Sequence, residues 1–133
     1  FIDDFVVNQD HPTYSSVGIT SFDQLGRMGA VHIATALYES IRTGEAINVV
    51  LDEIGWPADK RIVDYGATVI NWWWEEDVSA LSAVTKLVYS EGIPAFIFID
   101  EFGNFVFRDR HHRYILDDSV NRTAQFTECE LDI

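Results

Sequence analysis

The clearest pattern of apolar positions in the chain lies between Asp77 and Gly92, and it predicts a helix. Five apolar residues recur there at the spacing of one helical face, namely Val78, Leu81, Val84, Leu87 and Val88. Asp77 is expected to cap the first turn, and Gly92 is expected to end the helix, with Pro94 just beyond it. The apolar face of this helix should therefore belong to the core.

Two apolar runs after this helix predict a β-hairpin. Residues 95–99 are apolar at every position, as expected for a strand that is covered on both faces, and residues 105–107 form the return strand. The turn between them, residues 100–104, contains Gly103 where a left-handed backbone would fit. Helix and hairpin together span residues 77–110 and form the central unit of the predicted fold.

The segment that precedes Ala30 predicts two strands and a short helix. The apolar stretches FIDDFVV and YSSVGIT are separated by turn-forming residues around Pro12, so we expect an antiparallel pair. Ser21 is expected to cap a helix that ends at Gly29. The apolar face of that helix consists of Phe22, Leu25 and Met28.

Residues 30–55 predict two more helices. The first, residues 30–42, rests on the helical spacing of Ile33, Leu37 and Ile41, although the same stretch is rich in β-branched and small residues. The second begins at Thr43 as N-cap, has Glu45 near the positive end of the helix dipole, and ends at Gly55. Its buried stripe consists of Ile47, Val50, Leu51 and Ile54.

A strand is predicted from Thr68 to Trp74, and it ends in three consecutive tryptophans. Because side chains alternate along a strand, Trp72 and Trp74 would face one side and Trp73 the other, so at least one ring would meet solvent or a partner. Two interpretations stay open. The rings pack in the core or under a loop, where Trp is usually buried, or they anchor an interface, where aromatic residues concentrate.

Together these elements predict a single α+β domain over residues 1–133, with helices packed on a mainly antiparallel sheet. A chain of this length buries roughly two-thirds of the surface that its unfolded form exposes. Residues 121–133 alternate loosely and could add a strand. Because the chain starts at Phe1, without Met or a signal peptide, we expect it to be an excised internal portion of a longer protein.

The charge of the chain limits its partners. Asp and Glu number 22, Lys and Arg number 9, and the formal net charge is -13. A nucleic-acid surface must neutralise phosphates with Lys and Arg, and an anionic membrane repels an acidic protein. Neither is an expected partner, and no apolar run approaches the roughly 20 residues of a membrane span.

Three acidic clusters could suggest acid–base or metal chemistry, but each has a structural interpretation. They are predicted to lie at an exposed helix end, at the start of the helix after Glu76, and at the hairpin tip. The clusters are Asp52-Glu53, Glu75-Glu76-Asp77 and Asp100-Glu101. None has the spacing of a Ca²⁺ loop or of an HExxH site.

Metal-ligand and nucleophile types are also present. Asp109, His111 and His112 are close in sequence, but adjacent histidines on an extended segment point to opposite sides, which disfavours a shared ion. Cys129 lies between two glutamates, which disfavour a thiolate nucleophile. The chain has no GxGxxG, P-loop or GxSxG motif. We therefore expect no catalytic residue, no metal and no cofactor.

Several short segments, read together, resemble one protein family. They are Gly55-Trp56-Pro57-Ala58-Asp59-Lys60-Arg61, Asp64-Tyr65-Gly66, the helix end Ser90-Glu91-Gly92, the hairpin that finishes in Phe107-Arg108-Asp109-Arg110, and Arg122-Thr123-Ala124-Gln125-Phe126. In combination these segments resemble the minor tail proteins of tailed bacteriophages, and the likeness covers residues 43–128. The chain departs from the family pattern in its three consecutive tryptophans, and residues 30–42 match no family segment.

The resemblance implies a structural component of a phage tail tip or baseplate hub, located in the virion. Such a component acts in virion assembly and in docking the tail tube to the receptor-binding apparatus. The implied partners are other tail proteins, with a homotrimer in the intact parent protein, and no enzyme activity is implied.

Two edges of the 77–110 unit are the expected protein interface. One consists of Trp72, Trp73 and Trp74, and the other of Arg108, Arg110 and Arg113. The three arginines are a third of all basic residues and could pair with an acidic patch on the next subunit. The alternative is that they are solvated strand ends paired locally with Asp109.

Two other functions stay open. A cell-wall hydrolase would use Glu75 or Asp109 as its acid, and would need two carboxylates converging in a cleft, one of them with a raised pKa. A carbohydrate-binding module would use the tryptophans as a stacking platform for sugars.

Overall fold

The computed structural model describes residues 2–11, 14–21 and 23–115, and for the first two of these ranges it describes the backbone only. The elements in chain order are β1 (Ile2–His11), β2 (Tyr14–Ser21), α1 (Gln24–Met28), β3 (His32–Ile33), β4 (Tyr38–Arg42), α2 (Thr43–Glu53), the 3-10 helix η1 (Ala58–Lys60), β5 (Arg61–Val63), β6 (Val69–Trp73), β7 (Val78–Ser79), α3 (Ala80–Glu91), β8 (Phe96–Ile99), β9 (Phe105–Arg108) and α4 (His112–Ile115). The predicted α+β class is confirmed, with α3 followed by the β8–β9 hairpin.

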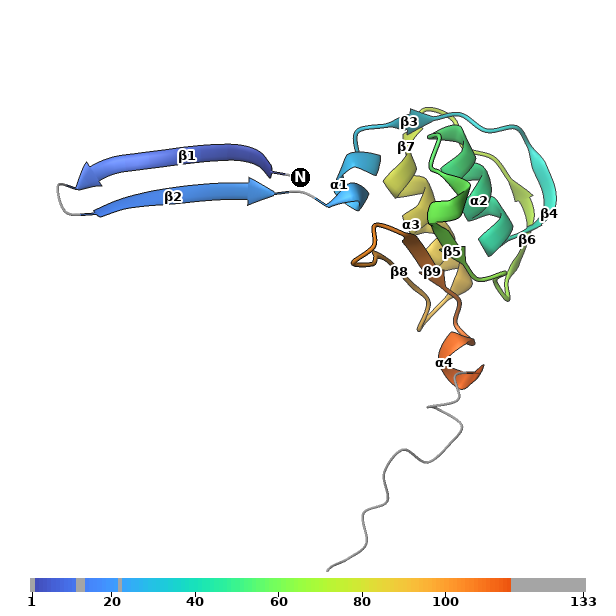
Figure 1. Ribbon diagram of the computed structural model, residues 1–133. Coiled ribbons are helices and arrows are strands. Elements are labelled where there is room, and N and C mark those ends of the chain that lie inside the picture. The colour runs from blue at the N-terminus through green and yellow to red at the C-terminus, as the bar shows by residue number, and fades with distance from the viewer. Residues whose placement is uncertain (1, 12–13, 22, 116–133) are drawn as a thin grey trace, which may run out of the picture.

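Helices α2 and α3 pack against each other at the centre of the body, and short sheets surround them (Figure 1). The strands pair as β1–β2, β3–β7, β4–β6 and β5–β9–β8, and every pairing except β5–β9 is antiparallel. One cluster of buried side chains joins both helices to β3, β4, β6 and β9. The predicted stripe of α2 is confirmed, since Ile47, Val50 and Leu51 are buried and Ile54 packs against them.

Helix α3 begins at Ala80, two residues later than predicted from Asp77 as N-cap. Its N-cap is Ser79, whose hydroxyl accepts a hydrogen bond from the Ser82 N–H at 3.2 Å. Asp77 has a left-handed backbone with φ 50°, and its Oδ1 lies 2.9 Å from Nδ1 of His32 instead of at the helix end. The intervening residues form β7, which pairs with β3, so strand pairing takes the place of the expected first helical turn.

The buried face of α3 is consequently rotated from the predicted one. It consists of Ala80, Ala83, Val84, Leu87 and Glu91. Val84 and Leu87 are buried as predicted, but Leu81 and Val88, which were expected on the same face, are only partly buried. Gly92 ends the helix as predicted, with φ 92°.

The strand that is covered on both faces is β9 and not β8, contrary to the prediction. In the order β5–β9–β8, β9 has a neighbour on each side, whereas β8 is an edge strand. Phe105, Val106 and Phe107 are at most 2% exposed, while Phe98 of β8 is 39% exposed. Both runs are equally apolar in sequence, and only the addition of β5 beside β9 distinguishes the central strand from the edge.

The hairpin turn is as predicted, with Gly103 left-handed at φ 77°. The Asp100 carboxylate accepts hydrogen bonds from the backbone of Phe102 at 2.9 Å and of Asn104 at 2.8 Å, and from the Asn104 side chain at 2.7 Å. Desolvation raises the pKa of Asp100, but these hydrogen bonds and the nearby charge of Lys60 together lower it by more. The pKa of Asp100 is therefore below its ordinary value. The acidic residue at the tip therefore shapes the turn.

The N-terminal segment contains the predicted antiparallel pair, β1 with β2, which stands clear of the other elements (Figure 1). The short helix α1 also forms and ends at Gly29 as predicted, but its N-cap is Asp23, whose carboxylate accepts from the Gly26 N–H at 2.9 Å. Ser21, the expected cap, is instead the last residue of β2.

The helix predicted for residues 30–42 is wrong, and the segment forms strands β3 and β4. A helix would have placed Ile33, Leu37 and Ile41 on one face. Ile33 and Ile41 are indeed buried, but Leu37 is 57% exposed. Ile33 pairs with Val78 of β7 and Ile41 with Ile70 of β6, so long-range partners overrode the apparent helical period.

Helix α2 starts where expected, but Arg42 and not Thr43 is its N-cap, with the Glu45 carboxylate accepting from the Arg42 N–H at 3.1 Å. The first turn lies against the loop that contains Gly66. A Cβ on Gly44 would come within 2.0 Å of the Asp64 carbonyl oxygen, so glycine is required for this approach.

Within the described ranges, no helix has the length and apolar character needed to cross a membrane. The expected strand at residues 121–133, Cys129 and the side chain of Phe22 lie outside the described residues.

Candidate functional site

The three tryptophans divide between the core and the surface. Trp73 is 6% exposed and packs with Tyr38, with ring centroids 5.8 Å apart. Trp72 and Trp74 are 58% and 57% exposed. The predicted alternation is confirmed, and the side chain of Trp73 is a core residue. Its buried indole N–H has no hydrogen-bond partner among the described residues, so Trp73 stabilises the core by packing.

Carboxylates surround the exposed pair of tryptophans. Glu39 is the cross-strand neighbour of Trp72 in the β4–β6 sheet and is exposed, as is Glu76 just beyond Trp74. Glu75 is 8% exposed and forms an ion pair with Lys86 at 2.9 Å. We call Trp72, Trp74, Glu39 and Glu76 the tryptophan surface. It combines two large apolar rings with negative charge, and such a surface suits a partner with apolar and cationic groups.

The arginine-rich segment after β9 is tied to the body by Asp64. One oxygen of this carboxylate accepts from the Arg108 guanidinium at 3.1 Å. The other accepts from the Asp109 N–H at 3.1 Å and lies 3.0 Å from Nδ1 of His112. Asp64 therefore fixes the direction in which the chain leaves β9 and the position of α4.

A second, fully buried carboxylate lies at the end of α3. Glu91 accepts from the Thr43 hydroxyl at 2.6 Å and from the backbone N–H groups of Ala67 and Thr68, each at 3.0 Å. Nε of Arg110 lies 3.9 Å from the same carboxylate, and the Arg110 guanidinium also donates to the Glu91 carbonyl at 3.3 Å. One side chain thus joins α2, α3, the loop before β6 and the segment after β9.

The hydrogen bonds decide the protonation state of Glu91. Desolvation raises the pKa of this carboxyl, but the bonds from Thr43, Thr68 and Ala67 lower it by more, so the pKa lies below its ordinary value of 4.5. Glu91 is therefore ionised at neutral pH although it is buried.

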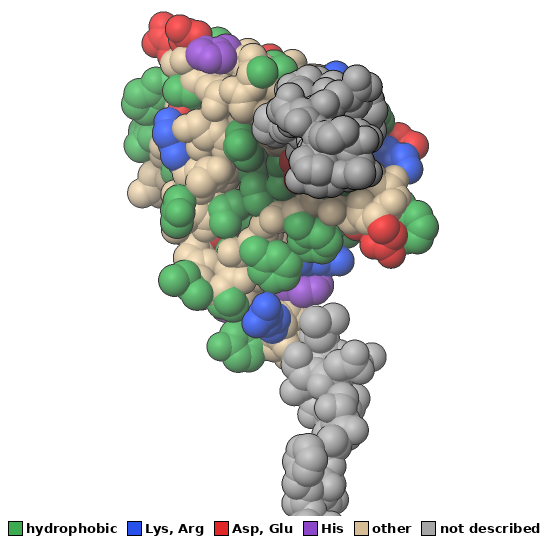
Figure 2. Space-filling view, turned by 90° about the vertical axis from the view of Figure 1, so that its left-hand side faces the viewer, with side chains coloured by type: hydrophobic (Ala, Val, Ile, Leu, Met, Phe, Trp, Pro, Cys, Tyr) green, Lys and Arg blue, Asp and Glu red, His purple; other side chains and the backbone are tan. Residues whose placement is uncertain are grey.

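Of the three predicted interface arginines, two are bound locally. Arg108 pairs with Asp64 and Arg110 with Glu91, and neither uses Asp109, the expected local partner. Arg113 is exposed and lies over the ring of Phe96, with 5.7 Å between Cζ and the ring centroid. Phe96 stacks in turn on Phe98. Figure 2 shows hydrophobic side chains gathered on the lower part of the face in view, beside Lys or Arg and His.

The described segments that carry the family resemblance, which exclude residues 122–126, bond to neighbouring parts of the fold. The indole N–H of Trp56 donates to the Lys60 carbonyl at 3.0 Å, and Arg61 donates to the Trp56 carbonyl and to Asp52. Asp64 and Glu91, described above, belong to the same segments. Sequence reasoning did not single out these two carboxylates as centres of networks. The signal for Glu91 was its position four residues after Leu87, on the buried face of the helix.

The metal and catalytic candidates are engaged elsewhere. His112 lies against Asp64, and the Asp109 carboxylate accepts from the His111 N–H at 2.9 Å. Among the residues that the structure describes, no group of three or more His, Cys, Asp or Glu side chains is placed to hold a metal ion. Glu75 is paired with Lys86.

Comparison of the chain with models of protein families, with curated proteins and with solved structures gives no match in any of the three. The chemistry of the surfaces must therefore be read from the residues themselves.

Replacing the tryptophans one at a time tests the division between core and surface. We expect Trp73→Ala to lower the free energy of unfolding by about 3–5 kcal/mol, because it leaves a cavity. Trp72→Ala and Trp74→Ala should each change it by about 0.5 kcal/mol or less, because both rings are exposed. Urea denaturation measures all three variants, and equal losses for Trp72→Ala and Trp73→Ala would contradict the assignment.

Replacing Glu91 tests the buried network through its pH dependence. The pKa of Glu91 is lower in the folded chain than in the unfolded chain. The ionised carboxylate therefore makes its full contribution to the free energy of unfolding above about pH 4.5, and this contribution is lost as pH falls through the folded pKa. We expect Glu91→Gln to lower stability by about 3–5 kcal/mol at pH 7, with a difference from the wild type that narrows at acid pH.

The matched control is Glu101→Gln at the exposed hairpin tip, which should lower the free energy of unfolding by less than about 0.5 kcal/mol. Thermal or urea unfolding between pH 3 and 7 gives the comparison. A Glu91→Gln deficit that stays constant over this range would show that ionisation of Glu91 does not stabilise the fold.

Proposed function

We propose that this domain is a structural component of a phage tail tip or baseplate hub, and that it acts in virion assembly by docking other tail proteins. The observation that carries the proposal is the division of the three tryptophans at the end of β6. Trp73, the last residue of the strand, is in the core, whereas Trp72 in the strand and Trp74 just after it are exposed to a partner. Aromatic rings exposed at a fixed position on a sheet are typical anchors of protein interfaces.

The structural positions of the segments that resemble minor tail proteins support the phage context. Trp56, Arg61, Asp64 and Glu91 bond to neighbouring elements of the fold, as expected if the resemblance reflects a shared framework. Partner contacts would then come from other residues, principally the tryptophan surface and the exposed Arg113. The proposed partners are other tail proteins, within a trimeric parent protein.

A non-catalytic role is consistent with the surroundings of two carboxyls, which lower their pKa. The pKa values of Glu91 and Asp100 are both lowered, whereas a general acid at neutral pH needs a raised pKa. Glu75 and Asp109, the acids considered for a cell-wall hydrolase, are held by Lys86 and by the His111 N–H.

A carbohydrate-binding module is the second candidate, and the exposed tryptophan pair favours it. Trp72 and Trp74 are two positions apart, so in an extended chain their rings lie on one side, about 7 Å apart along the backbone. Aromatic rings at such a spacing can stack on successive sugars. The acidic side chains Glu39 and Glu76 could accept hydrogen bonds from sugar hydroxyls.

Immuno-electron microscopy of the phage that encodes the chain tests the proposal. Antibodies raised against the domain should label the tail tip of intact virions. A Trp72→Ala/Trp74→Ala parent protein should fold and yet give fewer complete tails, because the surface that contacts neighbours has lost its two rings. Particle counts after gradient centrifugation measure the effect.

The control is Tyr89→Ala, which removes an aromatic ring that is 81% exposed and belongs to α3 instead of to the tryptophan surface. Absence of label from virions would contradict the proposed location. Two results together would favour the sugar-binding module. The double variant would assemble normally, and cell-wall oligosaccharides would quench the Trp fluorescence of the wild-type chain. A cleared zone in a cell-wall zymogram would favour the hydrolase.

A further inference from the structure

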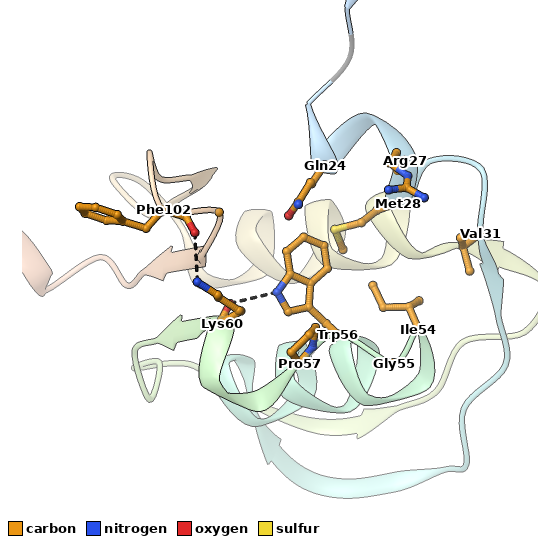
Figure 3. A pocket seen from close by; sticks show the side chains of 11 residues that line it. Gln24, Arg27, Met28, Val31, Ile54, Gly55, Trp56, Pro57, Lys60 and Phe102 are labelled. Carbon is orange, nitrogen blue, oxygen red and sulfur yellow. Dashed lines mark hydrogen bonds between the residues drawn. The ribbon is translucent and has the colours of Figure 1, made fainter. Parts of the chain in front are cut away.

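An open groove of about 370 Å³ lies between α1 and the segment that follows α2, with the tip of the β8–β9 hairpin at its border (Figure 3). It is separate from the tryptophan surface. Its apolar wall includes Met28, which is 2% exposed, together with the partly buried Ile54 and Trp56. The volume is within the range of about 300–1,000 Å³ that is usual for ligand sites.

Hydrogen bonds hold the groove open in one shape. The Trp56 indole donates to the carbonyl of Lys60 at 3.0 Å, and the Lys60 ammonium donates to the carbonyl of Phe102 at 3.2 Å, as Figure 3 shows. Arg61 also donates to the Trp56 carbonyl. The wall after α2 is thus fixed to the hairpin tip, and a preformed site loses less entropy when a partner binds.

The charge of the groove differs from that of the chain. The whole protein has 22 Asp and Glu against 9 Lys and Arg, yet none of the eleven described residues that line the groove is acidic. Lys60 and Arg27 both line it. Arg27 has an interaction of its own, so Lys60 is the cation considered for an occupant. Its ammonium uses one of its three N–H donors on Phe102, and its charge also acts on the nearby Asp100 carboxylate.

The mouth of the groove adds exposed apolar surface. Phe102 is 70% exposed and Val31 is 43% exposed, and both line the groove. Gln24 adds a neutral amide to the wall near the hairpin tip. An occupant is therefore offered an apolar surface, one amide and one ammonium group.

We propose that the groove binds a peptide segment of a partner protein in which an aromatic or aliphatic side chain is flanked by carboxylates. The apolar side chain would lie against Met28 and Trp56, and a carboxylate would accept a hydrogen bond from Lys60. Charge complementarity favours this occupant, because a cationic segment would meet Lys60 with like charge and a purely apolar molecule would leave it unused. The inference does not depend on the proposed phage function.

Two synthetic peptides test the proposal on the intact chain. The first is acetyl-Ser-Glu-Phe-Asp-Glu-Leu-Ser-amide, and the second has Lys in place of each acidic residue. At about 0.15 M salt, where the Debye length is about 8 Å, NMR titration should show saturable shifts for the acidic peptide at the amides of Gly55, Lys60 and Gly103. The net charge of -13 repels this peptide, so binding requires a local site.

Charge variants then locate the contact. Lys60→Ala should weaken binding about fivefold, and Gln24→Glu, which adds a carboxylate to the wall at nearly constant shape, should weaken it similarly. Lys86→Ala is the matched control, because it removes the same charge from α3, where Lys86 pairs with Glu75, and should leave the dissociation constant unchanged.

The proposal would be overturned by the absence of saturable shifts with the acidic peptide, by equal or tighter binding of the lysine peptide at the same amides, or by equal losses of affinity in Lys60→Ala and Lys86→Ala. Shifts confined to Trp72 and Trp74 would also contradict it, because the peptide would then occupy the tryptophan surface.

Discussion

The ionised carboxylate of Glu91, buried at the end of α3, is the interaction on which the arrangement of the body depends. Removing a charge from water costs several kcal/mol, and the cost is offset only when hydrogen bonds and an opposite charge surround the group. Thr43, Ala67, Thr68 and Arg110 supply these partners from three separate parts of the chain. The fold is therefore held together at the one place where α2, the loop before β6 and the exit from β9 all meet α3.

This constraint has consequences for the surfaces that meet partners. The loop that Glu91 holds leads directly into β6, which has Trp72 at the surface and Trp73 in the core, and the exposed Trp74 follows the strand. On the other side, Arg108 and Arg110 are bound to Asp64 and Glu91, which leaves Arg113 as the exposed cation of the three. Two of the three predicted interface arginines thus make contacts within the fold, whereas two of the three predicted tryptophans, Trp72 and Trp74, are exposed.

Local patterns in the sequence predicted the elements whose partners are close in the chain. The β8–β9 hairpin, Gly103 in its turn, the stripe of α2 and the alternation of the tryptophans all follow from short-range spacing. The errors at residues 30–42, at Asp77 and in the choice of β8 as the covered strand share one cause. In each case a strand formed with a distant partner, β7 or β6 for the first, β3 for the second and β5 for the third.

The candidate site was predictable only in part, for the same reason. Two exposed tryptophans follow from alternation, but the carboxylates near them and the groove beside Trp56 arise from the packing of segments that are distant in sequence. Glu91 and Asp64 were recognised as parts of motifs, yet their roles depend on donors 19 to 48 residues away. A charged residue on the apolar face of a helix was the available sign that a buried network exists.

Amide hydrogen exchange at Ala67 and Thr68 tests the central role of Glu91 most directly. These residues belong to a loop with no strand partner, and their N–H groups donate to the Glu91 carboxylate. If that carboxylate organises the body, both amides should exchange as slowly as those of β9, through global unfolding. Exchange at the rate of exposed loop amides such as Glu101 would contradict the account.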